Sequence, residues 1–193
     1  MLSSAPLIVG IGGTTRAFSS SERALRYALD CVAALGCNTE VIAGPDMPIE
    51  PFDPSKPERS ERALTMIAAL RRADGVIVAS PGYHGSISGL VKNALDYTED
   101  MRTDARVYLD GMAFGAIAAA DGPQALGSTV AALRSIAHAL RAWPTPYAAM
   151  INSSAKPFGE DGQTMDPAVA KGLELVAEQV VMFARMRRGM AVS

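Results

Sequence analysis

The chain has 193 residues, of which 49% are hydrophobic and 20% are charged, and its formal net charge is −2. This length fits one domain over residues 1–193, and so small a charge does not indicate binding to nucleic acid or to an anionic membrane. The N-terminus has no signal-peptide pattern, and charged residues interrupt every apolar run, so we expect a cytoplasmic protein that does not span a membrane. Cys31 and Cys37 do not form a C-x-x-C motif and are expected to be reduced thiols.

The first predicted strand, residues 7–11, runs into a loop rich in glycine and hydroxyl side chains. Residues 7–21 read LIVGIGGTTRAFSSS, and a helical pattern over 20–35 follows. This arrangement brings hydroxyls, backbone N–H groups and the Arg16 guanidinium to one point at a helix N-terminus, where anions are favoured. The loop therefore predicts a site for the dianion of a phosphomonoester. The alternative is a plain turn with a polar rim.

Two common phosphate-binding motifs do not fit this loop. A Walker A loop requires a lysine, and none occurs here. The dinucleotide fingerprint G-x-G-x-x-G begins with Gly10 and Gly12, but Thr15 stands at its last glycine position. The acidic ribose ligand expected after the second strand is also missing, because residues 41–45 read VIAGP. These mismatches favour a phosphate cradle over an NAD(P) fingerprint.

The rest of the chain alternates apolar, β-branched runs with amphipathic stretches. Strands are predicted over 39–42, 75–79, 114–119 and 147–151, helices over 57–72, 88–99, 126–141 and 167–187, and long loops over 43–55 and 152–165. Five consecutive βα units predict an α/β fold with a doubly wound, five-stranded parallel sheet and helices on both faces. Ligands bind such sheets beyond the carboxyl ends of the strands, so the loops after strands one, three and four are expected to share one cleft.

The loop after the third strand, residues 80–86 (SPGYHGS), is the second candidate ligand segment. Its proline and glycines predict a tight, irregular backbone that points N–H groups at a flat polar ring. Tyr83 offers a ring face or a hydroxyl to that ligand, or else packs against the base of its own loop. His84 has no serine, cysteine or aspartate partner in a recognisable arrangement, which favours a positioning or solvent-exposed histidine over a general base.

Two further pairs of residues lie near the predicted cleft or on a helix surface. Asp121 and Gly122 predict a turn after the fourth strand, beside the same cleft. Lys92 and Asp96, four residues apart on one helix, form a surface ion pair or contact a second subunit. The sequence shows no acid–base dyad, catalytic triad or metal-ligand cluster, so we expect neither a catalytic side chain nor a metal.

Two of these segments together resemble the NAD(P)H-dependent FMN reductase family. Residues 13–21 (GTTRAFSSS) are similar to its G-[ST]-x-R-x-x-S phosphate loop, with Thr14 where serine is usual. Residues 80–86, followed by Gly89, Lys92, Asn93 and Asp96, are similar to its P-x-Y-x-x-S-x-x-x-x-x-K-N-x-x-D segment. The resemblance covers residues 6–150, and the last helix fits the architecture rather than a motif.

The resemblance implies a flavodoxin-like fold that binds FMN. The implied phosphate-binding residues come from the first loop: Thr14, Arg16, Ser19, Ser20 and Ser21. The implied isoalloxazine contacts, mainly through backbone groups, come from the second loop: Pro81, Gly82, Tyr83, His84, Gly85 and Ser86. Asp121 and Gly122 are implied to lie beside the flavin. The positions of Gly82 and His84 vary in the family, so no role for the His84 side chain is implied.

The activity that the resemblance implies is hydride transfer from NADPH or NADH to FMN, in a homodimer or homotetramer. A monooxygenase that consumes the reduced flavin is an implied partner. Such cofactor chemistry requires stacked rings rather than a side-chain acid or base, which agrees with the missing dyad or triad. Two alternatives remain: an FMN-containing reductase of quinones, azo dyes or metal oxyanions, and a non-enzymatic flavodoxin-like electron carrier. Because flavodoxins are strongly acidic, a net charge of −2 argues against the carrier.

Overall fold

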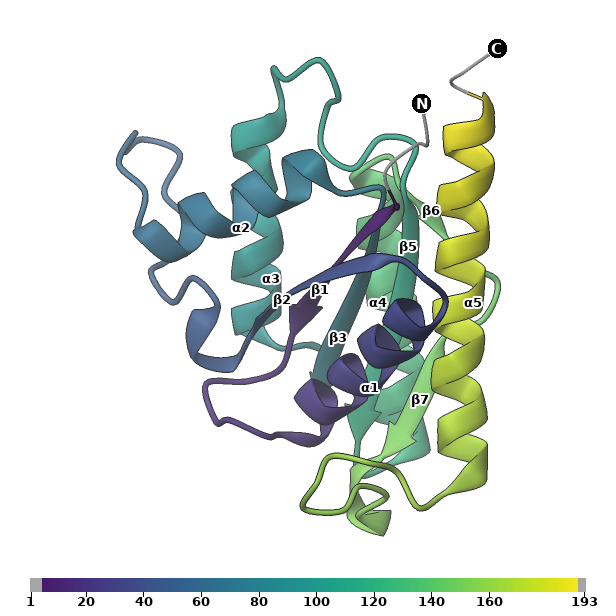
Figure 1. The fold of residues 1–193 in the computed structure, drawn as a ribbon. Coiled ribbons are helices and arrows are strands. Elements are labelled where there is room, and N and C mark those ends of the chain that lie inside the picture. Colours follow the sequence, from purple (N-terminus) through teal and green to yellow (C-terminus); the bar gives the residue numbers. More distant parts are fainter. Residues whose placement is uncertain (1–4, 191–193) are drawn as a thin grey trace.

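The computed structural model describes residues 5–190, without the side chain of Met190, and has an α/β fold (Figure 1). The parallel strands of its central sheet are β1 (Leu7–Gly12), β2 (Asn38–Ala43), β3 (Gly75–Tyr83), β5 (Ala113–Ala120), β6 (Trp143–Pro144) and β7 (Ala149–Asn152). The order across the sheet is β2-β1-β3-β5-β6, and β7 also pairs with β5. All these strands place their carboxyl ends at one edge, as the βα pattern predicts.

The prediction of five strands is wrong, because the sheet has seven. The expected fifth strand, 147–151, corresponds to β7, which begins two residues later and pairs with the end of β5, whereas β6 is an additional short strand that pairs with the start of β5. Pro144 and Pro146 have no N–H to donate and lie at the break in the ladder between β6 and β7. The seventh strand, β4 (Ser86–Ile87), turns back antiparallel onto the end of β3. It lies inside a glycine-rich segment whose composition predicts only a loop.

Helices cover both faces of the sheet, as predicted. They are α1 (Ser20–Ala34), α2 (Glu61–Arg72), α3 (Gly89–Asp96), α4 (Pro123–Ala139) and α5 (Pro167–Met190). α1 and α5 pack on one face, and α2, α3 and α4 lie on the other (Figure 1). The described helices include none with both the length and the apolar content needed to cross a bilayer.

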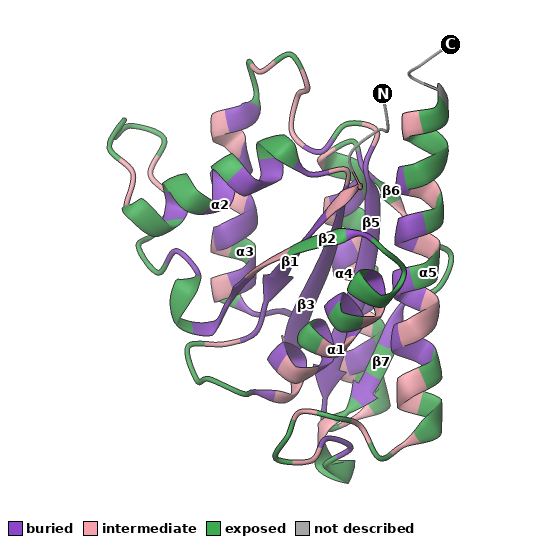
Figure 2. Ribbon diagram, viewed as in Figure 1, coloured by how far each residue is buried: buried purple, intermediate pink, exposed green. Residues whose placement is uncertain are grey.

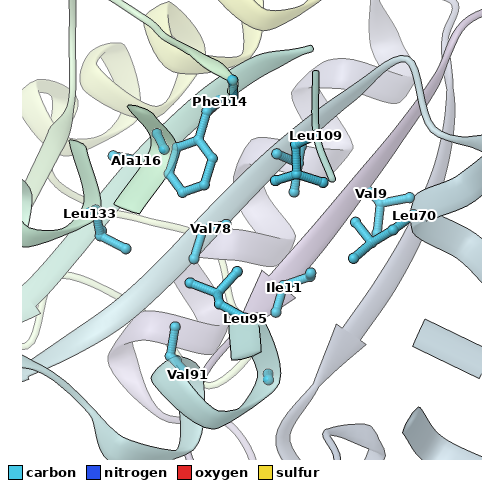
Figure 3. Close-up of a cluster of buried hydrophobic side chains, with 14 of the residues drawn as sticks. Val9, Ile11, Leu70, Val78, Val91, Leu95, Leu109, Phe114, Ala116 and Leu133 are labelled. Carbon is cyan, nitrogen blue, oxygen red and sulfur yellow. The ribbon is translucent and has the colours of Figure 1, made fainter. Parts of the chain in front are cut away.

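Buried apolar side chains form one cluster on each face of the sheet. Figure 2 shows that the strands of the sheet and the inner sides of the helices consist largely of buried residues. Val9 and Ile11 of β1 and Phe114 of β5 belong to the first cluster, beneath Leu70 and Leu133 of the helices (Figure 3). The second cluster takes the alternate strand positions, together with side chains of α1 and α5. Residues on each strand thus alternate between two buried layers, which explains the unbroken apolar runs in the sequence.

The proline-rich segment 43–55 follows β2 and is tied to α3 by the side chain of Asn93. Its amide nitrogen donates to the carbonyl oxygens of Pro48 (3.2 Å) and Glu50 (2.8 Å), and its Oδ1 accepts from the Phe52 N–H at 2.8 Å. The Tyr97 hydroxyl donates to the Glu50 carbonyl at 3.0 Å. Asn93 therefore fixes a long surface loop by hydrogen bonding its backbone.

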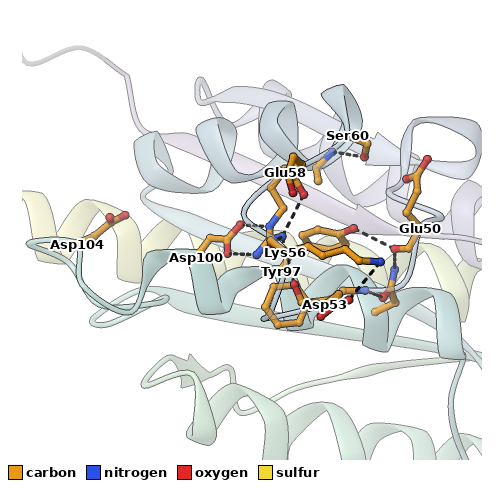
Figure 4. Close-up of polar contacts among 12 residues, drawn as sticks. Glu50, Asp53, Lys56, Glu58, Ser60, Tyr97, Asp100 and Asp104 are labelled. Atoms are coloured by element: carbon orange, nitrogen blue, oxygen red, sulfur yellow. Dashed lines mark hydrogen bonds and ion pairs between the residues drawn. The ribbon is translucent and has the colours of Figure 1, made fainter.

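Arg59 attaches the chain just beyond this segment to Asp100, which Figure 4 shows near Tyr97. Its guanidinium makes a bidentate pair with Asp100, at 2.7 and 2.8 Å, and lies 4.9 Å from the centre of the Phe52 ring. Hydrogen bonding to the Asp100 carboxylate raises the pKa of Arg59, so this pair stays charged. Lys92 and Asp96 form the predicted surface ion pair, with Nζ and Oδ1 2.5 Å apart.

Candidate functional site

The carboxyl ends of the strands open into a cavity of about 400 Å³. The loops after β1, β3 and β5 all line it, as expected for loops beyond the carboxyl ends of a doubly wound sheet. Its predicted lining residues are Thr14, Arg16, Ser19, Ser20, Ser21, Pro81, Gly82, Tyr83, Asp121 and Gly122. The structure thus brings three segments that are distant in the sequence to one place.

The loop after β1 crosses closely over the end of β3. A Cβ atom on Gly12 would lie 2.1 Å from the carbonyl oxygen of Ala79, so only glycine fits there. The N–H of Gly13 donates to that same carbonyl at 3.2 Å, and Gly13 has a φ of 92°. The glycines therefore serve the close approach of two strands rather than a dinucleotide.

The hydroxyl groups of this loop gather at the start of α1. Ser19 caps the helix, with Oγ accepting the N–H of Glu22 at 3.3 Å, and its Oγ lies 3.3 Å from that of Ser21. A serine that accepts one hydrogen bond still has its own proton to donate. The first-turn N–H groups and the helix dipole act at the same point, so this end of the cavity favours an anion.

Thr14 and Arg16 form the outer part of the loop. Thr14 Oγ1 accepts the N–H of Arg16 at 3.1 Å, which makes a compact local turn. Arg16 is exposed at the edge of the cavity, and within residues 5–190 no carboxylate forms an ion pair with its guanidinium. A cation without an internal partner beside two serine hydroxyls suits a bound dianion.

The second loop is a tight β-hairpin between β3 and β4. His84 (φ 50°) and Gly85 (φ 90°) form its two-residue turn, a left-handed geometry that matches the strand twist. Ser80 is fully buried at the base, where its Oγ donates to the Pro81 carbonyl and accepts the Ser88 N–H, both at 2.9 Å. The hairpin is therefore held rigidly where it meets the cavity.

The hairpin divides the predicted site residues into two groups. Pro81, Gly82 and Tyr83 line the cavity, and Tyr83 is 53% exposed, so its ring is not packed against the base of the loop. His84, Gly85 and Ser86 lie at the exposed tip, outside the cavity lining found among residues 5–190. Their part in ligand binding stays a prediction.

The remaining walls consist of four small residues that no functional-group motif singles out. They are Ala119, Ala120, Ala125 and Ser153. Alanines carry no functional group that a motif search could recognise, but their small size leaves space beside the strand ends. Ser153 follows β7, which pairs with the end of β5 and so places its own loop at the same edge. Once the pairing of β7 with β5 is known, the position of Ser153 at the cavity can be predicted.

The cavity also receives a second helix N-terminus. Gly122 is the N-cap of α4, Pro123 follows it, and no side chain caps the helix. Free backbone N–H groups of the first turn are therefore available on this side. Asp121 lies beside them, so polar backbone groups and one carboxylate form the wall opposite the serine-rich loop.

Two other observations limit the chemistry of the chain. Within the described part of the chain, no group of three or more His, Cys, Asp or Glu side chains is placed to hold a metal ion. Cys31 and Cys37 are free thiols, and Cys37 is buried. The cavity combines an anion-binding loop with a wall of small residues, so it is suited to binding a ligand.

Comparison with known proteins identifies relatives of this chain. Residues 6–156 match the protein family described as NADPH-dependent FMN reductase. An NADPH azoreductase from Bacillus sp. (strain OY1-2) is 33% identical over 94 residues, which cover 47% of this chain and 48% of that protein. The FMN reductase (NADPH) of Escherichia coli (strain K12) is 29% identical over 139 residues, covering 69% and 63%. The chain therefore spans less than two thirds of the length of these relatives.

Solved structures agree in fold. FerB, a flavoenzyme NAD(P)H:(acceptor) oxidoreductase from Paracoccus denitrificans, superposes with a TM-score of 0.75 at 19% identity, over 94% of this chain and 98% of that one. A flavodoxin, WrbA-like protein from Agrobacterium tumefaciens gives 0.63 at 18% identity, over 95% and 99%. These similarities show a flavodoxin-like fold. Because the family match extends over most of its length, the chain belongs to the NADPH-dependent FMN reductase family.

Proposed function

We propose that the protein is an NAD(P)H-dependent FMN reductase that transfers hydride from nicotinamide to FMN. The observation that carries this proposal is the joining of an anion cradle and a flat, small-residue shelf in one cavity, in a member of this family. A mononucleotide has those two parts, a phosphate and a planar ring. We also propose that residues 1–193 act as one FMN-binding domain.

The phosphate would be held by the loop between β1 and α1. Thr14, Ser19, Ser20 and Ser21 supply hydroxyl donors or first-turn N–H groups, and Arg16 supplies the cation. Hydrogen bonds from a guanidinium to a phosphate are charge-assisted and about twice as strong as neutral ones. The loop therefore selects FMN over riboflavin, which has no phosphate.

The isoalloxazine ring would lie against the hairpin residues Pro81, Gly82 and Tyr83, with the Asp121-Gly122 turn beside it. A Cβ on Gly82 would stand 2.7 Å from Thr129 Oγ1, so the hairpin packs directly on α4 at this point. Small residues and backbone groups then face the ring. We propose that His84, Gly85 and Ser86 act from the hairpin tip, where the ring edge meets solvent.

When bound, FMN supplies the hydride-accepting chemistry. The protein has to hold its ring at the open side of the cavity, where a nicotinamide can stack on it. The uncapped N-terminus of α4 directs backbone N–H groups into the cavity and stabilises negative charge there. This division of labour requires no catalytic side chain and no metal.

The test is an FMN titration of the purified protein followed by addition of NADPH or NADH. The proposal predicts saturable FMN binding and FMN-dependent oxidation of one or both nicotinamides, seen as loss of absorbance. If the protein neither binds FMN nor oxidises NADPH or NADH in its presence, the proposal is wrong. Comparison of the two nicotinamides also measures the cofactor preference.

A second candidate is an FMN-containing reductase of quinones, azo dyes or metal oxyanions. The NADPH azoreductase similarity favours it, as does the half-exposed Tyr83 at an open cavity, which leaves room for a second acceptor. FMN retained through purification, with fast quinone or azo-dye turnover, would distinguish it. A non-enzymatic electron carrier would instead stabilise a one-electron state and oxidise no NAD(P)H.

We further propose that the protein is a homodimer or homotetramer in the cytoplasm, with a monooxygenase as a possible user of the reduced flavin. Exposed apolar side chains support self-association: Trp143 is 62% exposed, and Met182 and Met186, one turn apart on α5, are more than half exposed. Burying such side chains against a second copy is favourable. Light scattering at several protein concentrations tests the assembly.

A further inference from the structure

We propose that Glu22 is a positioning residue, which holds the loop between β1 and α1 in the conformation that binds the FMN phosphate. The inference rests on the proposed function. Glu22 lies in the first turn of α1, only 2% exposed, and is not among the residues that line the cavity. The side chain therefore does not touch a ligand in the cavity, and it can affect one only by holding the loop or through its charge.

Both carboxylate oxygens of Glu22 are engaged. Oε2 accepts the backbone N–H of Phe18 at 2.9 Å, and Oε1 accepts from Nε (2.9 Å) and Nη2 (2.8 Å) of Arg26, one turn further along α1. A buried carboxylate is costly unless it is paired in this way. Arg26 thus compensates the charge, and Oε2 is free to hold the loop.

The held residue has an unusual backbone. Phe18 has a φ of 58°, in the left-handed region that side chains other than glycine rarely adopt. Its ring is 66% exposed, so packing of the ring does not account for the conformation. The charge-assisted hydrogen bond from its N–H to Glu22 is the contact that stabilises it. Phe18 joins the exposed part of the loop to the helix cap at Ser19.

Glu22 also fills the space between two loops. Ideal Cβ atoms on Gly13 and Gly44 would each stand 3.2 Å from it, from its Cβ and its Oε2 respectively. Both glycines have positive φ values, 92° and 56°. The side chain therefore lies between the loop after β1 and the turn after β2. A shorter side chain at this position would leave the loop after β1 without this contact.

The charge of Glu22 and its hydrogen bond to Phe18 are expected to have opposite effects on FMN binding. A carboxylate close to a phosphate dianion repels it, so removing the charge alone would tighten FMN binding. Removing the hydrogen bond to Phe18 would instead weaken FMN binding, because the loop would no longer be held. Glu22→Gln keeps an acceptor without the charge, Glu22→Asp keeps the charge but shortens the reach, and Glu22→Ala removes both.

The experiment measures the dissociation constants of FMN and riboflavin for these variants, together with hydrogen–deuterium exchange of residues 14–18 without flavin. We expect Glu22→Ala and Glu22→Asp to weaken FMN binding about tenfold, a loss of ~1.4 kcal/mol. Riboflavin binding should stay within about twofold. Glu22→Gln should bind FMN at least as tightly as the wild type, and exchange should be faster in the alanine and aspartate variants.

Asp74 provides a matched control. It accepts the backbone N–H of Leu7 (2.8 Å) and is also paired bidentately with a guanidinium, that of Arg188 (2.8 Å to each oxygen). It precedes β3 at the opposite end of the sheet from the cavity. Asp74→Ala should lower the melting temperature and leave the FMN to riboflavin affinity ratio unchanged.

Three outcomes would overturn the role of Glu22. These are equal losses for FMN and riboflavin, tighter FMN binding in every variant, and unchanged exchange of residues 14–18 in the alanine and aspartate variants. A wild-type protein that binds FMN no better than riboflavin would instead count against the phosphate site in the proposed function. The exchange measurement is made without flavin, so it still decides whether Glu22 holds the loop.

Discussion

Arg16 is the residue on which the proposed recognition of a phosphate most depends. It stands at the mouth of the cavity with Thr14 Oγ1 bound to its backbone N–H, so the loop fixes its main chain and leaves the guanidinium to a ligand. The serines at the start of α1 are neutral donors. Arg16 therefore supplies the one full positive charge among the predicted phosphate-binding residues.

We predict that Arg16→Ala weakens FMN binding by about tenfold to a hundredfold, because one charge-assisted hydrogen bond contributes ~1.5–3 kcal/mol. Riboflavin affinity should change much less, and both are measured by quenching of flavin fluorescence. Arg102→Ala, at an exposed arginine paired with Glu99, is the control and should alter neither. Equal losses for the two flavins would show that Arg16 does not recognise the phosphate.

The sequence predicts most of the cavity residues that belong to a recognisable motif, but not the alanines beside them. The hydroxyls of the first loop, Arg16 and Tyr83 reach the cavity as expected. Ala119, Ala120 and Ala125 do not differ in sequence from alanines of the core, and only the ends of β5 and α4 show what they face. Glu22 fits a helix cap in the sequence, but its bond to Phe18 depends on a backbone angle that no pattern predicts.

Among the secondary-structure elements, the β3–β4 hairpin determines the shape of the ring end of the cavity. Ser80 closes its base, and Gly82 packs against α4 with no space for a side chain. The hairpin and the helix behind it therefore move together. The sequence predicts tightness here from proline and glycine, but not the short antiparallel strand that produces it.

We predict that Gly82→Ala destabilises the protein by about 1–3 kcal/mol, since its Cβ would meet Thr129 Oγ1 at 2.7 Å and the Ala125 carbonyl at 3.1 Å. Urea unfolding measures this, and riboflavin binding should weaken as the hairpin shifts. Gly89→Ala is the control, because nothing lies within 4 Å of that Cβ. Equal effects of the two substitutions would argue against close packing of the hairpin on α4.

The attachment of the proline-rich segment to α3 gives a third prediction. Asn93→Ala removes all three hydrogen bonds between this side chain and the segment, and should lower the free energy of unfolding by about 1–3 kcal/mol. Proteolysis of residues 43–55 should become faster in the native state. Unchanged proteolysis would mean that Arg59 and Tyr97 hold the segment without Asn93.

Strands were predictable where burial on both faces makes them continuously apolar, as in β1, β3 and β5. The prediction was incomplete at the sheet edge. There β7 lies close to the expected strand 147–151, but β6 was not expected, because Pro144 and Pro146 obscure a strand that needs hydrogen-bond partners on one side only. The local composition does not show which residues of such a segment form hydrogen bonds with β5.

Across the whole molecule, topology concentrates the polar groups at one edge of the sheet. The order β2-β1-β3-β5-β6 places the β1 and β5 loops on either side of β3, and the N-termini of α1 and α4 both reach the cavity between them. Two helix N-termini and Arg16 favour an anion at this edge, although Asp121 lies beside them and the net charge of the chain is −2. The site is therefore a local feature of the fold and not of the overall charge.

The most direct test of the proposed function is the rate of NADPH and NADH oxidation by the purified protein as FMN is titrated, with riboflavin titrated in parallel. The proposed function predicts saturable oxidation with FMN, and half-saturation at a clearly higher concentration with riboflavin, because only FMN has a phosphate for the proposed cradle of Thr14, Arg16 and Ser19. Absence of FMN-dependent oxidation with either nicotinamide would contradict the assignment as an FMN reductase. Equal half-saturation by the two flavins would contradict the phosphate site.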